Sequence, residues 1–338
     1  MNITLPDREQ FNFKEVVIDG DDCWLITPKD MSTSWTDENA RFRSCIVRQE
    51  DHWIVSQGFP KFVNWGERPD FQTWDKAWKI KARRKLDGSL LIVGRYQGKF
   101  IMRTRGTIDA RQMANGHEID FLLNKYKSFF DGFENVYTGG WSYLFEWTTP
   151  NNIIVLREHD EPTLTFLGMI LNESGQMLPI EEIGDYVDVE KHGFEIPETY
   201  EYDTVEDCIL DVATWKGKEG VVIYSPDGQT LKKIKADAYC ELHKLATGMK
   251  TTENVIDVFL TSPRFTKYSE FYNFIETTLD YEIAEKLKAD ILKICVAYSE
   301  VIVKIEAVNH LLSQIKGETF TRRDQALEIQ ANFSDWRK

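Results

Sequence analysis

A lysine followed at short spacing by an aspartate and a glycine is the feature of this sequence best suited to covalent chemistry. The residues are Lys85-Leu86-Asp87-Gly88, at the start of a strand-like run. A deprotonated lysine amine is a nucleophile toward an activated phosphorus atom, and nearby cations or burial lower its pKa enough to allow this. Gly88 has no side chain and would let a nucleotide sugar approach the backbone. Alone, such a tetrapeptide is more often a surface turn, so other residues must decide.

Two carboxylates and a pair of lysines would complete a phosphate-binding site. Glu146 lies in the apolar run Leu-Phe-Glu-Trp, where a carboxylate is costly unless it holds a metal ion, a cation or a hydroxyl. The alternative is a glutamate on the exposed face of an edge strand. Glu219 opens a later strand-like segment that Lys233 and Lys235 close. Residues two apart in a strand point to the same face, so both ammonium groups suit a triphosphate with its metal ion, unless they are merely solvated lysines.

Charge is distributed unevenly along the 338 residues, whose formal net charge is -14. Residues 76–105 contain ten Lys or Arg and one acidic residue, whereas residues 181–206 contain ten acidic residues and one lysine. The net charge argues against a protein that coats nucleic acid with its whole surface. It leaves room for a local basic groove, although the basic stretch also fits a solvated strand and turn.

Composition predicts a globular protein that stays in the cytoplasm. Hydrophobic residues make up 42% and charged residues 28% of the chain, which is enough apolar material for a sizeable core. No apolar run approaches the roughly 20 residues of a membrane helix, and Met1–Asn12 is too polar for a secretory or import leader. The five scattered cysteines are expected to be reduced core residues, and the six histidines form no spaced cluster typical of a zinc site.

Strand-like segments dominate up to about residue 240. They are rich in β-branched and aromatic residues and are bounded by turn-forming residues. Two of them are predicted hairpins, with turns at Gln97-Gly98 and at Pro226-Asp227-Gly228. The predicted segments are the hairpin 89–105, the strands 141–147 and 153–156, and the hairpin 221–235.

Beyond about residue 250 the apolar residues recur at intervals of three and four. The repeat runs from Ile283 to Leu312 and predicts a long amphipathic helix. Thr321 begins a weak capping box, which predicts a last helix. The fold class expected is therefore α+β, with a β-rich mixed domain at residues 1–246 followed by an all-helical domain at residues 247–338.

The order of these motifs resembles that of the covalent nucleotidyltransferases, which comprise ATP-dependent DNA ligases, RNA ligases and mRNA capping enzymes. Over roughly residues 40–245 the chain is most similar to the phage RNA ligase 1 family, which is associated with tRNA repair. As in that family, a long segment precedes the lysine and helices rather than a β-barrel follow the last motif. The motifs that carry the resemblance are Lys85–Gly88 with Ser89-Leu90, Arg105-Gly106, Met113–Gly116, Phe145–Trp147, Thr149–Leu156, Glu219–Val222 and Leu231–Tyr239.

The resemblance implies an ATP-grasp-like ligase fold, a mixed and antiparallel β-rich nucleotidyltransferase domain with an all-α domain after it. It also implies an ATP-dependent RNA ligase that joins 5′-phosphate and 3′-hydroxyl ends through lysyl-AMP and adenylylated RNA. The expected cofactors are ATP and Mg²⁺ or Mn²⁺. The expected partners are RNA, with cleaved tRNA as a candidate, and a separate end-healing kinase-phosphatase. Such an enzyme would work in the cytoplasm, that of a host cell if the protein is viral.

Roles for individual residues follow from the same resemblance. Lys85 is the expected nucleophile, Asp87 a hydrogen-bonding or metal-linked partner in sealing, and Lys233 and Lys235 contacts of the α-phosphate and leaving group that also depress the pKa of Lys85. Glu146 and Glu219 are expected ligands of the metal or the ribose hydroxyls. The complete set expected to bind the nucleotide is Arg43, Lys61, Lys85, Gly88, Arg105, Glu146, Glu219, Lys233 and Lys235.

Two positions depart from the family pattern. Ser44 stands where a glycine usually follows the upstream arginine, and Arg105 stands where the family has a lysine. The second change keeps the positive charge and can add a bidentate phosphate contact. The helical region is open to two interpretations, recognition of broken tRNA or a plain helical cap that buries its apolar stripe.

Two rival functions remain open at this stage. One is the same chemistry on DNA nicks or RNA caps, against which the missing barrel argues. The other is a non-catalytic RNA-binding protein with a degenerate site, which would use residues 76–105 as a phosphate-contacting surface. The presence together of every catalytic residue type argues against the second.

Overall fold

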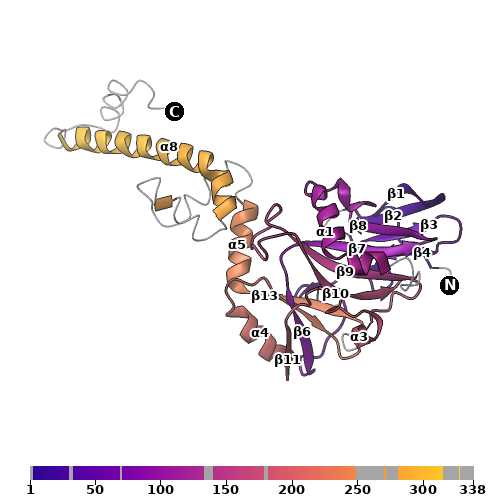
Figure 1. The fold of residues 1–338 in the computed structure, drawn as a ribbon. Helices are drawn as coiled ribbons and strands as arrows, with labels where there is room; N and C mark the ends of the chain where they lie inside the picture. The colour runs from indigo at the N-terminus through magenta and orange to yellow at the C-terminus, as the bar shows by residue number, and fades with distance from the viewer. Residues whose placement is uncertain are drawn as a thin grey trace. The chain divides into compact units, whose positions relative to one another are not determined.

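The computed structural model describes residues 3–29, 33–68, 71–132, 140–178, 182–248, 270–271, 281–314 and 327. The chain divides into two compact units, Met1–Glu241 and Leu242–Lys338. The first unit contains three sheets whose strands are almost all antiparallel, with short helices between them (Figure 1). The expectation of a sheet-rich mixed α and β fold is confirmed for this unit.

The first sheet has four strands in the order β1-β2-β3-β4. Its strands pair antiparallel, from Phe11 opposite Pro28 at one end to Cys45 opposite Gln57 at the other. A short 3₁₀ helix, η1 (Ala40–Arg43), packs Phe42 into the core of this sheet. The strands are β1 (Phe11–Ile18), β2 (Asp21–Pro28), β3 (Cys45–Arg48) and β4 (Ile54–Gln57).

The second sheet has the order β10-β9-β7-β8 and contains the first predicted hairpin. Gln97 and Gly98 both have positive φ, 46° and 89°, as a two-residue type I′ turn requires. The hairpin prediction is confirmed, and the predicted strand 141–147 is confirmed as β9. The strands are β7 (Ser89–Tyr96), β8 (Lys99–Thr104), β9 (Trp141–Thr148) and β10 (Thr163–Leu171).

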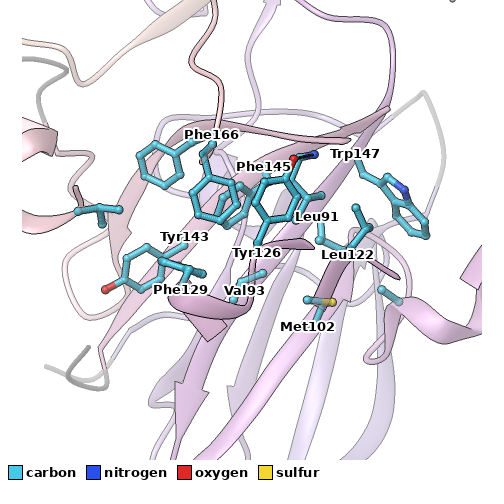
Figure 2. Packing of buried hydrophobic residues seen from close by; sticks show 14 of the residues in the cluster. Leu91, Val93, Met102, Leu122, Tyr126, Phe129, Tyr143, Phe145, Trp147 and Phe166 are labelled. Carbon is cyan, nitrogen blue, oxygen red and sulfur yellow. Dashed lines mark hydrogen bonds between the residues drawn. The ribbon is translucent and has the colours of Figure 1, made fainter. Parts of the chain in front are cut away.

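An aromatic core fills one face of the second sheet. Figure 2 shows Phe129 beside Tyr143 and Phe145, and the ring centroids of Phe129 and Phe145 are 5.8 Å apart at an edge-to-face angle. Pairs of this geometry add to the stabilisation from burial. The short helices near this core are η2 (Ala110–Gln112), η3 (Gly116–Glu118), α1 (Ile119–Lys125), α2 (Lys127–Gly132) and α3 (Ile183–Tyr186).

The third sheet has five strands in the order β11-β6-β12-β13-β5. The second predicted hairpin is confirmed as β12 and β13, with Gly220 opposite Lys235. Helix α4 (Val205–Ala213) packs on this sheet and is capped by Thr204, whose hydroxyl accepts the amide of Asp207 at 3.1 Å. The strands are β5 (Val63–Asn64), β6 (Ile80–Lys85), β11 (Thr199–Tyr202), β12 (Gly220–Tyr224) and β13 (Leu231–Lys235).

The predicted strand at residues 153–156 is wrong, because this segment is irregular. The amides of Val155 and Leu156 donate to Oδ2 of Asp87, at 2.7 and 2.8 Å. An amide that donates to a side chain in this way is not available to a strand ladder. The β-forming residue types are therefore used in a loop that holds a carboxylate.

The second unit is described chiefly through one helix. The predicted long helix is confirmed as α8 (Tyr281–Gln314), and α5 (Asp237–Gly248) leads into this unit. Ile291 and Ile294 are buried, whereas Val301 and Ile305 on the same predicted stripe are about half exposed. The helix predicted from Thr321 lies outside the described residues. Among the helices that the structure describes, none is long and apolar enough to cross a membrane.

Candidate active site

Lys85 is the last residue of β6, at the point where β6 and β12 stop pairing. Register places Gly220 directly opposite Lys85, so Glu219 lies beside the lysine. Lys85 Nζ donates to Glu219 Oε2 at 2.7 Å, and Lys235 Nζ lies 2.9 Å from Glu219 Oε1. The Glu219 side chain is 2% exposed and that of Lys85 is 24% exposed. One buried carboxylate therefore holds two lysines that the sequence assigned to the same site.

Gly220 makes this arrangement possible. Its φ is +143°, and a Cβ at this position would lie 2.1 Å from the carbonyl oxygen of Ile234. A side chain would push β12 away from β13 and carry Glu219 with it. Gly88 is needed for a similar reason, because its Cβ would lie 2.7 Å from the carbonyl oxygen of Trp147. The sequence argument linked Gly88 to a nucleotide sugar, and the structure adds its close packing on β9.

The carboxylate of Asp87 is buried, and its charge contributes to raising the pKa of Lys85. Besides the amides of Val155 and Leu156, it accepts the hydroxyl of Tyr239 at 2.9 Å. Lys235 Nζ lies 4.9 Å from the centre of the Tyr239 ring. Tyr239, on α5, thus contacts two of the predicted catalytic residues, although the sequence offered no role for it beyond its place in a motif.

Glu146 lies on β9, which is flanked by β10 and β7. The alternative of an edge-strand glutamate is therefore wrong. Its Oε1 accepts the amide of Gly88 at 3.1 Å. Burial raises the pKa of Glu146 to about 7, with Glu219 and Asp87 adding to the rise and Lys85 opposing it.

This raised pKa predicts a pH-dependent stability difference. A carboxyl whose pKa is higher in the folded state loses stability as pH rises from its ordinary pKa of 4.5 to about 7. Glu146→Gln matches the protonated form at every pH. We expect the melting temperature of Glu146→Gln to exceed that of the unmodified protein at pH 8, with the difference disappearing at pH 5.

Glu161→Gln is the matched control for thermal unfolding at both pH values. Glu161 is exposed, and its hydrogen bond to Lys125 lowers its pKa. Removing that charge should slightly lower the melting temperature at pH 8, whereas Glu146→Gln should raise it. An equal difference for Glu146→Gln at pH 5 and pH 8 would contradict the raised pKa.

A second group of cations lies next to Lys85. The guanidinium carbon of Arg43 and Nζ of Lys233 lie 5.2 and 5.8 Å from the centre of the Phe62 ring. Burial lowers the pKa of Lys233 to about 8, and the positive charges of four neighbours, Arg43, Lys235, Lys85 and Lys61, contribute to this shift. Burial and Arg105 lower the pKa of Arg43 to about 10.

The other two predicted basic residues belong to this group. Burial lowers the pKa of Lys61, and the charges of Arg43 and Arg105 lower it further. Within the described part of the chain, no carboxylate forms an ion pair with Arg43, Lys61, Arg105 or Lys233. Cations that repel one another and form no ion pair with a described carboxylate make a site for a polyanion. The structure thus brings all the predicted site residues into one region.

Ser44, the departure from the family pattern, holds Arg105 in place. Its hydroxyl donates to the carbonyl oxygen of Arg105 at 2.9 Å and accepts Nη1 of Arg103 at 2.7 Å. Arg103 is fully buried, and its other donors reach Ser56 Oγ and the carbonyl oxygens of Ser44 and Thr104. A serine at this position therefore has a structural partner that a glycine would lack.

The pKa of Lys85 differs from the sequence-based expectation. Burial lowers it, but Glu219, Glu146 and Asp87 together outweigh burial and raise the pKa above its ordinary value. The positive charges of Lys233 and Lys235 were expected to depress this pKa, but its net shift is upward because the carboxyl groups outweigh the opposing effects. Three carboxyl groups near Lys85 keep its amine protonated.

The carboxylates differ in their capacity to hold a metal ion. Both carboxylate oxygens of Glu219 contact lysines. In Glu146, Oε1 accepts the amide of Gly88, whereas Oε2 accepts no hydrogen bond from the described residues. No group of three or more His, Cys, Asp or Glu in the described residues is arranged to hold a metal ion. This donor set fits Mg²⁺, which typically binds one or two carboxylates together with substrate phosphates and water.

Comparison with known proteins found similar sequences and similar solved structures. A family model described as RNA ligase matches residues 41–242. A putative bifunctional polynucleotide kinase/RNA ligase of Autographa californica nuclear polyhedrosis virus is 26% identical over 223 residues, 60% of this chain and 30% of the viral protein. The chain thus spans under a third of the length of that relative.

Among solved structures, an archaeal ATP-dependent RNA ligase matches with a TM-score of 0.50 at 14% identity, covering 95% of this chain and 83% of that chain. This likeness shows a shared fold. An RNA ligase of Naegleria gruberi solved with ATP and Mn has a TM-score of 0.43 at 19% identity, covering 50% of this chain and 52% of that chain.

Proposed function

The chain belongs to the RNA ligase family, as its motifs led us to expect, and on that premise we propose that it is an ATP-dependent RNA ligase. It would join a 5′-phosphate end to a 3′-hydroxyl end of RNA. The observation that carries the proposal is the position of Lys85, whose amine contacts the buried carboxylate of Glu219 and lies near a cluster of cations that repel one another.

The proposed reaction consists of three in-line displacements at phosphorus. The amine of Lys85 attacks the α-phosphorus of ATP and releases pyrophosphate, which leaves lysyl-AMP. The AMP is transferred to an RNA 5′-phosphate, and the RNA 3′-hydroxyl then displaces AMP. In such reactions the protein mainly positions groups and neutralises charge.

Individual residues suit these steps. The proton on Lys85 must leave before the attack, and Glu219, 2.7 Å away, is a base within hydrogen-bond reach. Arg43, Lys61 and Lys233 would hold the triphosphate, and Arg105 would add a planar contact. Glu146 would hold Mg²⁺ or Mn²⁺, which when bound would neutralise charge on the phosphates.

We also propose that two parts of the chain have different functions. Residues 1–246 would form the adenylyltransferase domain, and residues 247–338 an all-helical domain that recognises RNA, with cleaved tRNA as the candidate. The long helix α8 supports a helical domain. The viral relative is described as both a kinase and a ligase, which supports an end-healing kinase as the partner that supplies 5′-phosphates. The five unpaired cysteines suit the cytoplasm.

The proposal is tested by incubating the protein with Mg²⁺ or Mn²⁺ and α-labelled ATP or GTP, then denaturing it. Acid-labile label from ATP on the polypeptide is the expected result, followed by joining of 5′-phosphorylated RNA but not of the matched DNA. Label from GTP would indicate capping chemistry instead. Folded protein that takes label from neither nucleotide would leave the RNA-binding alternative.

Lys233→Met should separate activity from stability. Loss of this cation should slow lysyl-AMP formation about 10²–10³-fold, the usual cost of one charge-stabilising donor. Because the pKa of Lys233 is lowered to about 8, its charge destabilises the folded state below pH 8, and this effect vanishes above its ordinary pKa. The variant should therefore melt at a higher temperature than the unmodified protein at pH 7.

The exposed Lys216 provides the control, since Lys216→Met should change neither quantity. Single-turnover labelling and thermal unfolding measure the two effects. A Lys233→Met protein that is less stable at pH 7, or labels at the unmodified rate, would contradict the role given to this lysine.

A further inference from the structure

Residues 155–158 form a bracket around the turn that follows Lys85. The amides of Val155 and Leu156 donate to the Asp87 carboxylate. In return, the amide of Asp87 donates to Oε1 of Glu158 at 3.2 Å. The bracket therefore holds both the side chain and the backbone of the turn.

Glu158 contacts the chain on both sides of Lys85. Its Oε2 lies 2.7 Å from Nη2 of Arg84, the residue before the lysine, while its Oε1 accepts the amide of Asp87, two residues after it. The Glu158 side chain is only 3% exposed. This buried carboxylate therefore links the residue before Lys85 to the backbone two residues after it.

The same carboxylate does not contact the amine itself. Side chains of neighbouring residues in a strand project to opposite faces, so the side chains of Arg84 and Lys85 lie on opposite faces of β6. Lys85 Nζ contacts Glu219 instead. Arg84 also approaches Glu198, with 3.8 Å between Nη1 and Oε1. Glu158 therefore contacts the residues on either side of Lys85 and not its amine.

We propose that Glu158 is a positioning residue for nucleotidyl transfer, which fixes the direction of the Lys85 amine by tying Arg84 to the amide of Asp87. This inference rests on the proposed function. In-line attack requires the amine near 3–3.5 Å from phosphorus, and a misplacement of about 1 Å can cost roughly 10²-fold in rate. The nucleotide itself is bound by Arg43 and Lys233, on other elements, so its affinity should not depend on Glu158.

The test compares single-turnover formation of lysyl-AMP by Glu158→Ala and Glu158→Gln over a range of ATP concentrations. We expect the maximal rate constant to fall about 10²-fold for alanine. Glutamine retains an oxygen for the Asp87 amide but presents an amide that cannot accept from Arg84, so it should lose about tenfold. The ATP concentration at half-maximal rate should stay within about twofold of the unmodified value in both.

The control is Glu161→Gln, in the same segment, whose carboxylate pairs with Lys125 and is 62% exposed. Its rate should not change. Rates are normalised to the fraction of protein that takes label, so partial unfolding alone does not mimic the effect. If Glu158→Ala does not fold, the nearly isosteric Glu158→Gln decides.

The outcomes separate the two proposals. Label on the unmodified protein with unchanged rate constants in the Glu158 variants would overturn the positioning role alone. A change in half-saturation equal to the change in rate constant would also overturn it, because it would place Glu158 in nucleotide binding. Absence of label from the unmodified protein would overturn the proposed function and this inference with it.

Discussion

Lys85→Ala is expected to lower covalent uptake of AMP by at least about 10⁴-fold, the scale of loss when a covalent nucleophile is removed. The amine of Lys85 is the group that would form the phosphoramidate bond, and methyl cannot replace it. The fold should survive, because Glu219 keeps its ion pair with Lys235 at 2.9 Å. Uptake is measured as acid-labile label on denatured protein after incubation with α-labelled ATP and Mg²⁺.

Lys85→Arg separates loss of the nucleophile from loss of the charge. A guanidinium keeps the positive charge beside Glu219 but is not a nucleophile at accessible pH. This variant should also take no label, yet retain ATP binding in an equilibrium assay. Lys81→Ala, four residues earlier on β6, is the control and should label normally. Residual label on Lys235 in the Lys85→Ala protein would show that the wrong lysine has been assigned.

Glu219→Gln is expected to have the second largest effect on the reaction. The carboxylate holds Lys85 at 2.7 Å and Lys235 at 2.9 Å, and a glutamine would direct its NH₂ group at one of the two ammonium groups. The maximal rate of lysyl-AMP formation should fall about 10²–10³-fold. The melting temperature should fall too, because two cations would share a buried site without their counter-charge.

The pH dependence distinguishes this variant from one that is simply damaged. Glu219 is the first among the carboxyl groups that raise the pKa of Lys85. The rate of lysyl-AMP formation should rise with pH as Lys85 loses its proton. Replacing Glu219 should shift this rise to lower pH. A general loss of folded protein would lower the rate at every pH without moving that rise.

The matched control for Glu219→Gln is Glu161→Gln. Glu161 also pairs with a lysine, Lys125, at 2.8 Å, but its side chain is 62% exposed and does not contact Lys85. Its pH profile should be that of the unmodified protein. A Glu219→Gln protein within tenfold of the unmodified rate, or with its rise moved to higher pH, would contradict the arrangement described here.

Local features of the fold were predictable because their causes lie within a few residues. The Gln97-Gly98 hairpin follows from turn residues that tolerate positive φ, and α8 follows from apolar spacing over many turns. The segment 153–156 has the residue types of a strand and is not one, because its amides bind Asp87. Residue type cannot show that a distant carboxylate competes for the same amides.

The candidate site was predictable as a set of residues but not as an arrangement. Motif order pointed to Lys85, Glu146, Glu219, Lys233 and Lys235 without showing how they meet. It also led to the wrong sign for the pKa of Lys85, since the lysines were expected to dominate and the carboxyl groups do. Glu158 stood out in no way, because it occurs in a charged run that reads as solvated surface.

By itself, the sequence determined the family, the hairpins and the long helix, and it singled out Lys85 as the candidate nucleophile. These depend on motif order and on short-range periodicity and turn chemistry. Tertiary structure alone decided that Glu219 meets Lys85 across 134 residues of sequence and that Glu158 ties the chain on both sides of that lysine. The physical reason is register, because the pairing of Gly220 with Lys85 is selected by the packing of the whole sheet.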